Sequence, residues 1–111
     1  MVNSLLTGNA TTGTNANGGA LSANGFVEIV NSTVALNSTS GQSADGGGIG
    51  GVGTLFLVNA TVTGNSTAGY GAFGAGISAS GNFYTANSLV LGNAAAGGGA
   101  PAFGYASLYS D

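Results

Sequence analysis

Apolar and polar positions along this chain recur at a fixed period. Residues 26–53 and 54–81 form two successive periods and are identical at 13 of 28 positions without a gap. Within one period, the runs 26–30 and 32–36 are rich in β-branched and other apolar residues, and a third short apolar run begins near residue 49. A fixed period of this length is typical of a repeat protein in which each unit forms one layer of a stack.

The period divides the chain into the repeats 1–25, 26–53, 54–81 and 82–109. Three short strands per repeat, with a single Asn between the first two, do not fit a hairpin. They fit one coil of a parallel β-helix, because 28 extended residues give a contour of roughly 90 Å at about 3.3 Å each. We therefore expect one all-β domain over residues 1–111. It is a right-handed parallel β-helix of about four coils, with three short strands per coil, a loop over 37–45 and no caps.

Alternation along the predicted strands assigns their faces. The residues expected to point inward on the first strand are Val27, Ile29, Leu55, Leu57 and Phe83. Those expected to point outward are Glu28, Phe56 and Tyr84. The opposite assignment would bury Glu28 without a partner, which is costly.

Two series of Asn residues follow the period. The first is Asn3, Asn31, Asn59 and Asn87; the second is Asn9, Asn37, Asn65 and Asn93. Asn tolerates the left-handed backbone region that a sharp corner requires, and stacked amides can form a hydrogen-bonded ladder. We assign the corner and the ladder to the first series.

The second series opens the predicted loop. Five Asn-x-Thr sequons are present, at Asn9, Asn31, Asn37, Asn59 and Asn65. In a chain this rich in Asn and Thr, they can arise by chance. If glycans are attached, Asn9, Asn37 and Asn65 are the accessible candidates, because the ladder would block Asn31 and Asn59.

Composition limits the partners of the chain. It contains no Lys, Arg, His, Cys or Trp, and its acids are Glu28, Asp45 and Asp111. Without basic side chains we expect no binding of nucleic acid or attraction to anionic lipid. No apolar run approaches the roughly 20 residues that span a bilayer, so no membrane insertion is expected. The first residues lack a signal-peptide pattern. Either export uses a signal outside this sequence, or the residues belong to a longer protein.

Short motifs add a resemblance to a known family. Gly18-Gly19-Ala20-Leu21 fits a Gly-Gly-Ala-Ile/Leu/Val motif, to which residues 46–49 and 74–77 are close, and Phe56-Leu57-Val58-Asn59 fits Phe-x-x-Asn. In these motifs the chain resembles the β-helical passenger repeats of polymorphic outer-membrane proteins of bacteria. The resemblance implies a β-helix at a cell surface or outside the cell. That family's membrane-anchoring barrel has no counterpart here.

Catalysis is not expected. Lyase and hydrolase chemistry on β-helices needs a strong base with a cation, or paired carboxylates. Glu28 and Asp45 fall on different segments, and neither recurs in another repeat. One carboxylate cannot supply a calcium shell. We therefore predict no enzyme activity, no metal and no cofactor.

The ends of the predicted stack suggest self-association. Bare strand edges recruit further strands, and no cap is evident at either end. In strict register Tyr105 follows Ile77, and Ser110 and Asp111 begin a fifth coil that Met1 would continue after a gap of one residue. The expected assembly ends are Met1, Val2, Tyr105, Leu108, Tyr109 and Asp111.

The leading hypothesis is a structural subunit of an extracellular filament, stacked head to tail with itself as partner. An alternative is a segment of a larger adhesin-like surface passenger, in which neighbouring coils cover the ends. Ice binding by a flat Thr face is a minor alternative, since the outward pairs mix Thr with Ala and Leu.

Overall fold

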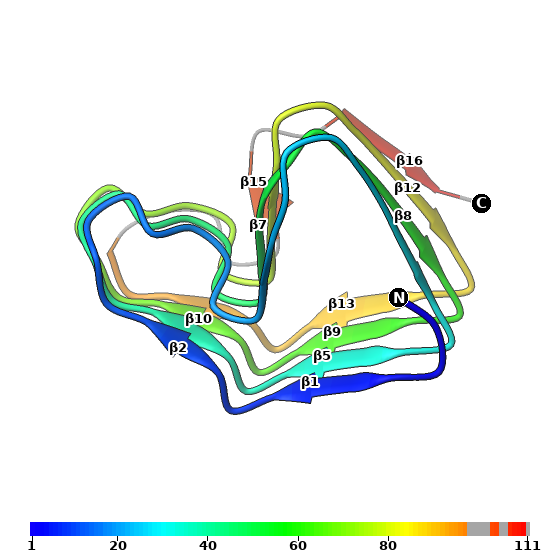
Figure 1. Ribbon diagram of the computed structural model, residues 1–111, viewed down its shortest axis with the longest axis horizontal. Helices are drawn as coiled ribbons and strands as arrows, with labels where there is room; N and C mark the ends of the chain where they lie inside the picture. Colours follow the sequence, from blue (N-terminus) through cyan, green and yellow to red (C-terminus); the bar gives the residue numbers. More distant parts are fainter. Residues whose placement is uncertain (98–102, 105–106, 111) are drawn as a thin grey trace.

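The protein is a right-handed parallel β-solenoid. The computed structural model describes residues 1–97, 103–104 and 107–110, which form strands and turns and no helix. In Figure 1 the chain runs clockwise while successive coils recede from the viewer, which is a right-handed winding. The described residues form sixteen short strands that pair in parallel as four four-stranded sheets, which we call A to D.

Each sheet takes one strand from each of four successive coils. Sheet A contains β4 (Phe26–Val30), β8 (Thr54–Val58), β12 (Asn82–Ala86) and β16 (Ser107–Ser110). Sheet B contains β1 (Leu5–Thr7), β5 (Thr33–Ala35), β9 (Thr61–Thr63) and β13 (Leu89–Leu91). Sheet C contains β2 (Ala10–Thr11), β6 (Ser38–Thr39), β10 (Ser66–Thr67) and β14 (Ala94–Ala95). Sheet D contains β3 (Leu21–Ser22), β7 (Ile49–Val52), β11 (Ile77–Ala79) and β15 (Phe103–Gly104).

The parallel solenoid agrees with the sequence prediction, but the number of strands per coil does not. A coil has four strands, because the segment that we expected to be a loop over 37–45 begins with the two-residue strand β6. A strand this short has no alternation of its own, so the sequence pattern could not reveal it. Its register with β2 and β10 is what makes it a strand.

The repeat register holds through most of the chain and shortens at the end. Ser66 and Thr67 still pair with Ala94 and Ala95, one full period further along. Ile77, however, pairs with Phe103, where the full period leads to Tyr105. Asn82 likewise pairs with Ser107, where the full period leads to Ser110. The expected pairing of Ile77 with Tyr105 is therefore wrong: Phe103 takes that place, and Tyr105 lies outside the described residues.

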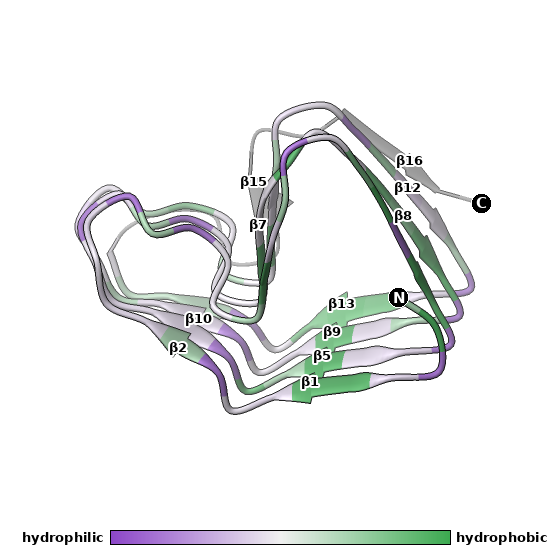
Figure 2. Ribbon diagram, viewed as in Figure 1, coloured by the Kyte–Doolittle hydropathy of each residue, from purple (hydrophilic) through white to green (hydrophobic). Residues whose placement is uncertain are grey.

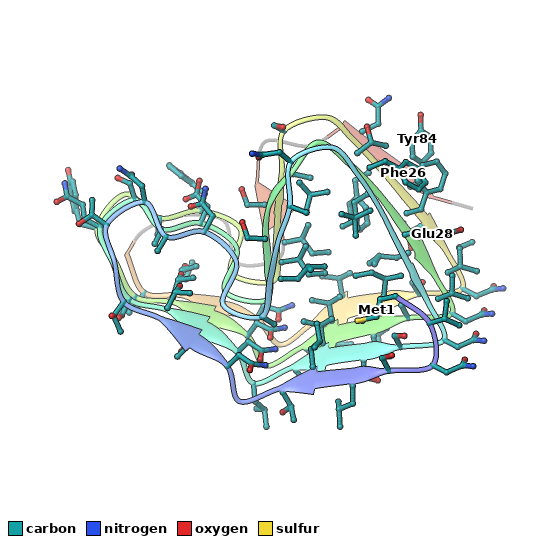
Figure 3. The ribbon with its side chains drawn as sticks, in the orientation of Figure 1. Met1, Phe26, Glu28 and Tyr84 are labelled. Carbon is teal, nitrogen blue, oxygen red and sulfur yellow. The ribbon has the colours of Figure 1, made fainter. Side chains whose placement is uncertain are left out.

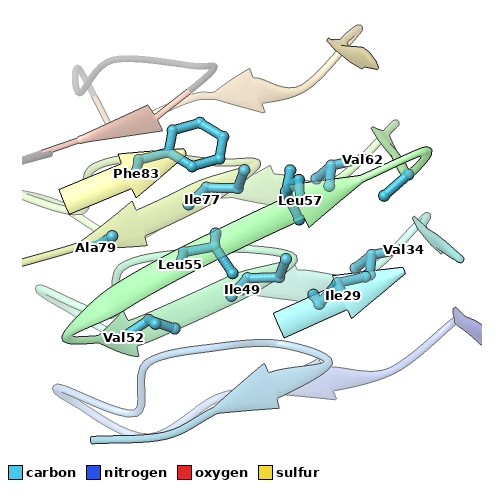
Figure 4. Close-up of a cluster of buried hydrophobic side chains, with 11 residues drawn as sticks. Ile29, Val34, Ile49, Val52, Leu55, Leu57, Val62, Ile77, Ala79 and Phe83 are labelled. Carbon is cyan, nitrogen blue, oxygen red and sulfur yellow. The ribbon is translucent and has the colours of Figure 1, made fainter. Parts of the chain in front are cut away.

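The cross-section has two lobes, visible in Figure 1. Sheets A, B and D enclose a triangular lobe, and sheet C with the turn that follows it forms the second. The core of the triangular lobe is a cluster of aliphatic side chains closed by Phe83 (Figure 4). Its members with no exposed surface are Ile29, Val34, Ile49, Val52, Leu55, Leu57, Val62, Ile77 and Ala79. Val27 is half-buried against this cluster, so the predicted inward face of sheet A is confirmed.

The two lobes meet at a narrow waist. A Cβ atom added to Gly47 would collide with the carbonyl oxygen of Ser66, so this close approach requires glycine or a locally shifted backbone. In the second lobe the buried side chains are small, among them Thr39, Ala44, Thr67 and Ala72. The second lobe therefore depends on small residues and hydrogen bonds, whereas the triangular lobe depends on aliphatic packing.

Hydrophobic strands and hydrophilic corners fall at the same places in successive coils, as the colours of Figure 2 show. Equivalent residues thus stack directly on one another along the solenoid axis. Within the described part of the chain, no helix is long and apolar enough to cross a membrane.

Candidate functional site

A buried ladder of Asn side chains runs along the corner between sheets B and C. The Nδ2 of Asn9 donates to the Oδ1 of Asn37 at 3.0 Å, Asn37 to Asn65 at 2.9 Å, and Asn65 to Asn93 at 3.0 Å. In each step the backbone N–H of the same donor residue also reaches that Oδ1, at 2.9 to 3.0 Å. All donors point from one coil to the next in the order of the chain.

The inner members of the ladder satisfy their hydrogen-bonding groups fully. The second hydrogen of the Asn65 amide is placed for the carbonyl of Val34 at 3.0 Å, and that of Asn37 for the carbonyl of Leu6 at 3.1 Å. Asn37 and Asn65 have no exposed surface. Buried amides of this kind stabilise the stack only while every member is present, because a missing partner leaves polar groups unsatisfied.

Our prediction for the first series was that Asn3, Asn31, Asn59 and Asn87 form both the corners and the ladder. The corners are confirmed, but the buried ladder is formed by the second series. The first-series residues have positive φ angles of 49°, 48°, 49° and 48°. Their side chains, however, are exposed, and the hydrogen bond from Asn59 to Asn31, at 3.2 Å, joins two exposed amides. Their role is in the backbone, whereas the second series supplies the ladder.

A local signal distinguishes the two series. Three of the second-series Asn residues follow a glycine with positive φ, namely Gly8, Gly64 and Gly92. That glycine already provides the left-handed residue of the corner, so the Asn beside it is free to turn its amide inward. In the first series, no glycine precedes Asn3, Asn31, Asn59 or Asn87, and the Asn itself is the left-handed residue.

The same geometry corrects the glycosylation prediction. Asn37 and Asn65 are fully buried in the ladder, so neither can carry a glycan in the folded protein. Asn9 is exposed because it lies in the first coil, and Asn31 and Asn59, which we expected to be blocked, are exposed corners. The sequons that the fold leaves accessible are therefore Asn9, Asn31 and Asn59.

Threonine hydroxyls form hydrogen bonds across the turn of the second lobe. Thr11 Oγ1 donates to the carbonyl of Ala16 at 2.8 Å, and Thr39 Oγ1 to that of Ala44 at 2.6 Å. Thr67 occupies the same position one coil further on, but its buried hydroxyl has no partner among the described residues. Thr39 and Thr67, which are both fully buried, therefore differ in the hydrogen bonding of their hydroxyls.

The two acidic side chains within the described residues, Asp45 and Glu28, lie in different parts of the fold. Asp45, in the turn between β6 and β7, accepts the backbone N–H of Phe73 at 2.7 Å, and its own N–H donates to Asn17 Oδ1 at 2.8 Å. Glu28 projects outward from β4 and is exposed (Figure 3). The described residues contain no group of three or more His, Cys, Asp or Glu that could hold a metal ion. The structure thus assigns Asp45 to linking adjacent coils and leaves Glu28 on the outer surface.

An aromatic stripe lies on the outer face of sheet A. The Phe56 ring stacks on Tyr84, with centroids 4.4 Å apart and planes at 19°, and lies 5.2 Å from the tilted ring of Phe26. Figure 3 shows Phe26, Tyr84 and Glu28 all projecting away from the core. The outward face predicted for Glu28, Phe56 and Tyr84 is confirmed. Because Phe56 contacts the rings of Phe26 and Tyr84 in the coils on either side of it, the stripe supports the stack of coils.

The outer face of sheet B carries Thr side chains in its middle coils and leucines at both ends. Leu5, Leu89 and Leu91 have exposed fractions of 62%, 52% and 47%. Beside this face, Leu36 is 69% exposed and has a φ of 59°, at the position that glycine takes in the other coils. The face is apolar at its ends rather than a continuous Thr array, and we do not propose ice binding.

Four of the predicted assembly residues lie at the two end faces of the stack. At the first coil, Val2 pairs with Val30, and the Met1 amine donates to the carbonyl of Glu28 at 2.7 Å. At the last coil, Leu108 and Tyr109 lie in β16, paired with Phe83 and Tyr84. Asp111 lies outside the described residues, as Tyr105 does. In the extrapolated register, Ser110 takes the first strand position of a fifth coil and one position before Met1 stays empty. In the structure Ser110 pairs with Thr85, which is the position that Met1 takes beside Ile29, so the predicted gap is wrong.

Comparison of the chain with protein-family models, curated proteins and solved structures finds no match. The resemblance to outer-membrane passenger repeats therefore rests on short Gly-rich and Phe-x-x-Asn motifs, and the fold rests on the geometry above.

Proposed function

We propose that this chain is a structural subunit of an extracellular filament, in which copies stack head to tail along the solenoid axis. The observation that carries the proposal is that all four sheets end in edge strands in the described structure. One end face presents β1, β2, β3 and the edge of β4, and the other presents β13, β14, β15 and β16. Unpaired parallel strand edges are a template for further strands.

The state of the core at these faces supports the same proposal. Leu6 and Leu21 in the first coil and Val90 in the last are only half-buried, whereas their equivalents in the inner coils, such as Val34 and Ile77, have no exposed surface. Another coil on either face would complete the burial of these side chains. Burial of apolar surface and pairing of strand edges then favour the same contact.

A segment of a larger surface passenger is the alternative, with further coils of one chain in place of further copies. Its support is the uniformity of the inner coils, which keep the full period with a local irregularity between β7 and β11. A cell-surface or extracellular location is part of both proposals and comes from the motif resemblance. Neither proposal assigns the chain a catalytic role, a metal or a cofactor.

Electron microscopy of the purified 111-residue chain, together with sedimentation, tests the filament. Four coils at about 4.8 Å spacing give an expected axial rise of roughly 19 Å per subunit. Trypsin is expected to leave the filament intact because the chain has no Lys or Arg. A chain that has the circular dichroism of a β-solenoid but sediments as a monomer at high concentration would contradict the filament and favour the surface passenger.

A further inference from the structure

We infer that β16 of one copy, while still paired with its own β12, also pairs with β4 at the start of the next copy, so that β16 is a bridging strand at the joint between subunits. This inference rests on the proposed filament and specifies its partner and register. The inference rests on an offset between the sheets: sheet A begins and ends one coil later than the other three sheets.

The offset is visible in the order of the strands. Sheets B, C and D begin with β1, β2 and β3 of the first coil, but sheet A begins with β4 of the second. In the part of the chain that the structure describes, Met1 and Val2 lie ahead of β4 and cover its end at Glu28 and Val30. Within the described residues, the outer edge of β4 at Phe26 and Val27 has no strand beside it. At the other end of the molecule, β16 extends one layer beyond β13, β14 and β15.

The register makes these two features complementary. Ser107, Leu108 and Tyr109 pair with Asn82, Phe83 and Tyr84. Through β8, these positions correspond to Phe26, Val27 and Glu28. The residues present in β16 are thus those that the layer ahead of β4 lacks. When one copy is stacked on the next with the coil spacing kept, β16 lies beside β4 of the next copy.

The backbone groups also have the right direction. In a parallel sheet, alternate residues of a strand bond to opposite neighbours. In β4 the groups of Glu28 and Val30 face the preceding layer, since they bond to Met1. By this alternation Phe26 also faces that layer, and in β16 Leu108 faces away from β12. The Leu108 N–H then meets the carbonyl of Phe26, and the N–H of Glu28 meets the carbonyl of Leu108.

The fit has one point of competition. Met1 aligns with Ile29 through the Val2–Val30 bridge. Ser110 aligns with Thr85 and hence with Leu57 and Ile29. Ser110 and Met1 would both lie beside Ile29 of the same β4. The joint therefore pairs residues 107–109 with β4 and displaces either Ser110 or Met1.

A disulfide between Cys residues introduced at positions 28 and 109 tests this joint. The natural chain has no Cys, and parallel neighbours about 4.8 Å apart are within disulfide range. Within one copy, positions 28 and 109 are separated by three strand spacings, roughly 14 Å, which is too far to bridge. Oxidation of the double variant Glu28→Cys/Tyr109→Cys is expected to convert the monomer band on a non-reducing gel into a ladder of multiples of 10.4 kDa.

The pair Tyr84→Cys/Tyr109→Cys is the matched control. These positions are direct neighbours within one copy, so the control is expected to close an intramolecular disulfide and show that β16 is in place. The single variants Glu28→Cys and Tyr109→Cys are expected to give no ladder beyond dimers. Filaments that form without the 28–109 cross-link, while the control closes, would overturn the pairing of β16 with β4 of the next copy and leave the proposed filament intact. A folded chain that forms neither filaments nor cross-links would overturn both.

Discussion

The amide of Asn37 donates to the Oδ1 of Asn65 at 2.9 Å, and both side chains are completely buried. This pair is the centre of the ladder that joins the four coils at one corner. It gives each coil a polar contact with its neighbours that is independent of the strand edges. It also makes each Asn of the ladder a partner of the residues above and below it.

Replacing Asn65 with Ala is expected to lower the free energy of unfolding by at least about 3 kcal/mol. The backbone N–H and the Nδ2 of Asn37 and the carbonyl of Val34 lose the Asn65 side chain as a partner, at about 1–3 kcal/mol each. The control is Asn59→Gly, which removes an exposed amide and keeps a residue suited to positive φ. That variant is expected to change stability by less than about 1 kcal/mol. Urea unfolding followed by circular dichroism measures both, and equal losses would contradict the ladder assignment.

Thr39 and Thr67 allow a second matched comparison, because they occupy the same buried position in adjacent coils. Thr39→Val removes the donor to the Ala44 carbonyl and is expected to destabilise the fold by about 1–2 kcal/mol. Thr67→Val removes a buried hydroxyl without a described partner and is expected to be neutral or stabilising. A larger loss for Thr67→Val in thermal unfolding would show that its hydroxyl is bonded in solution.

The protein is expected to be more stable with glycine in place of Leu36. It adopts a φ of 59° where the other described coils have glycine, and the left-handed region costs a non-glycine residue about 1–2 kcal/mol. Since 69% of the side chain is exposed, Leu36→Gly loses little packing, and a gain of roughly 0.5–1 kcal/mol is expected after the added chain entropy. The reverse control is Gly8→Ala, where a Cβ meets nothing within 4 Å, so any loss reports the backbone alone.

The aromatic stripe predicts an order of effects along sheet A. Phe56 contacts two rings and Phe26 one. At about 0.5–1.5 kcal/mol per aromatic pair, Phe56→Ala is expected to cost roughly twice as much as Phe26→Ala. Equal costs in denaturant unfolding would mean that the rings do not stack in solution.

Val90→Pro is expected to weaken assembly while the subunit still folds. Leu89 donates its N–H to Ala60 of the preceding coil, so by alternation the N–H of Val90 points to the open face of β13. Proline removes that donor. The matched control is Leu89→Pro, which removes an internal bond and is expected to unfold part of the last coil. Sedimentation and circular dichroism separate the two effects, and normal filaments from Val90→Pro would argue against pairing at this edge.

The sequence predicted the solenoid, its period and the faces of sheet A, because a repeated pattern of apolar residues directly reflects repeated burial. Ile29, Leu55 and Phe83 are in the core as expected, and Glu28 is outside. The period could not identify the ladder, since both Asn series follow it equally. The decision depends on whether Asn or the glycine before it turns the corner, which is a backbone property of a single residue.

Two further features could not be predicted from the repeat. The strand β6 consists of Ser38 and Thr39 alone, too few residues to show a pattern. The shortened register of the last coil arises after Ala95, where the residues no longer match the earlier repeats, so extrapolation placed Tyr105 where Phe103 lies. The repeat therefore predicts the features that the coils share, but it cannot predict the last coil, whose sequence no longer follows the repeat.

The direction of the Asn ladder has a consequence for symmetry. Every Asn amide donates toward the later coil, so the ladder is a row of aligned dipoles, with an acceptor oxygen facing out at Asn9 and a donor N–H facing out at Asn93. Two early faces would oppose acceptor to acceptor, and two late faces donor to donor. Only the joining of unlike faces continues the row. Any fibre built on this corner is therefore polar, with two chemically distinct tips, and can lengthen at each tip at its own rate.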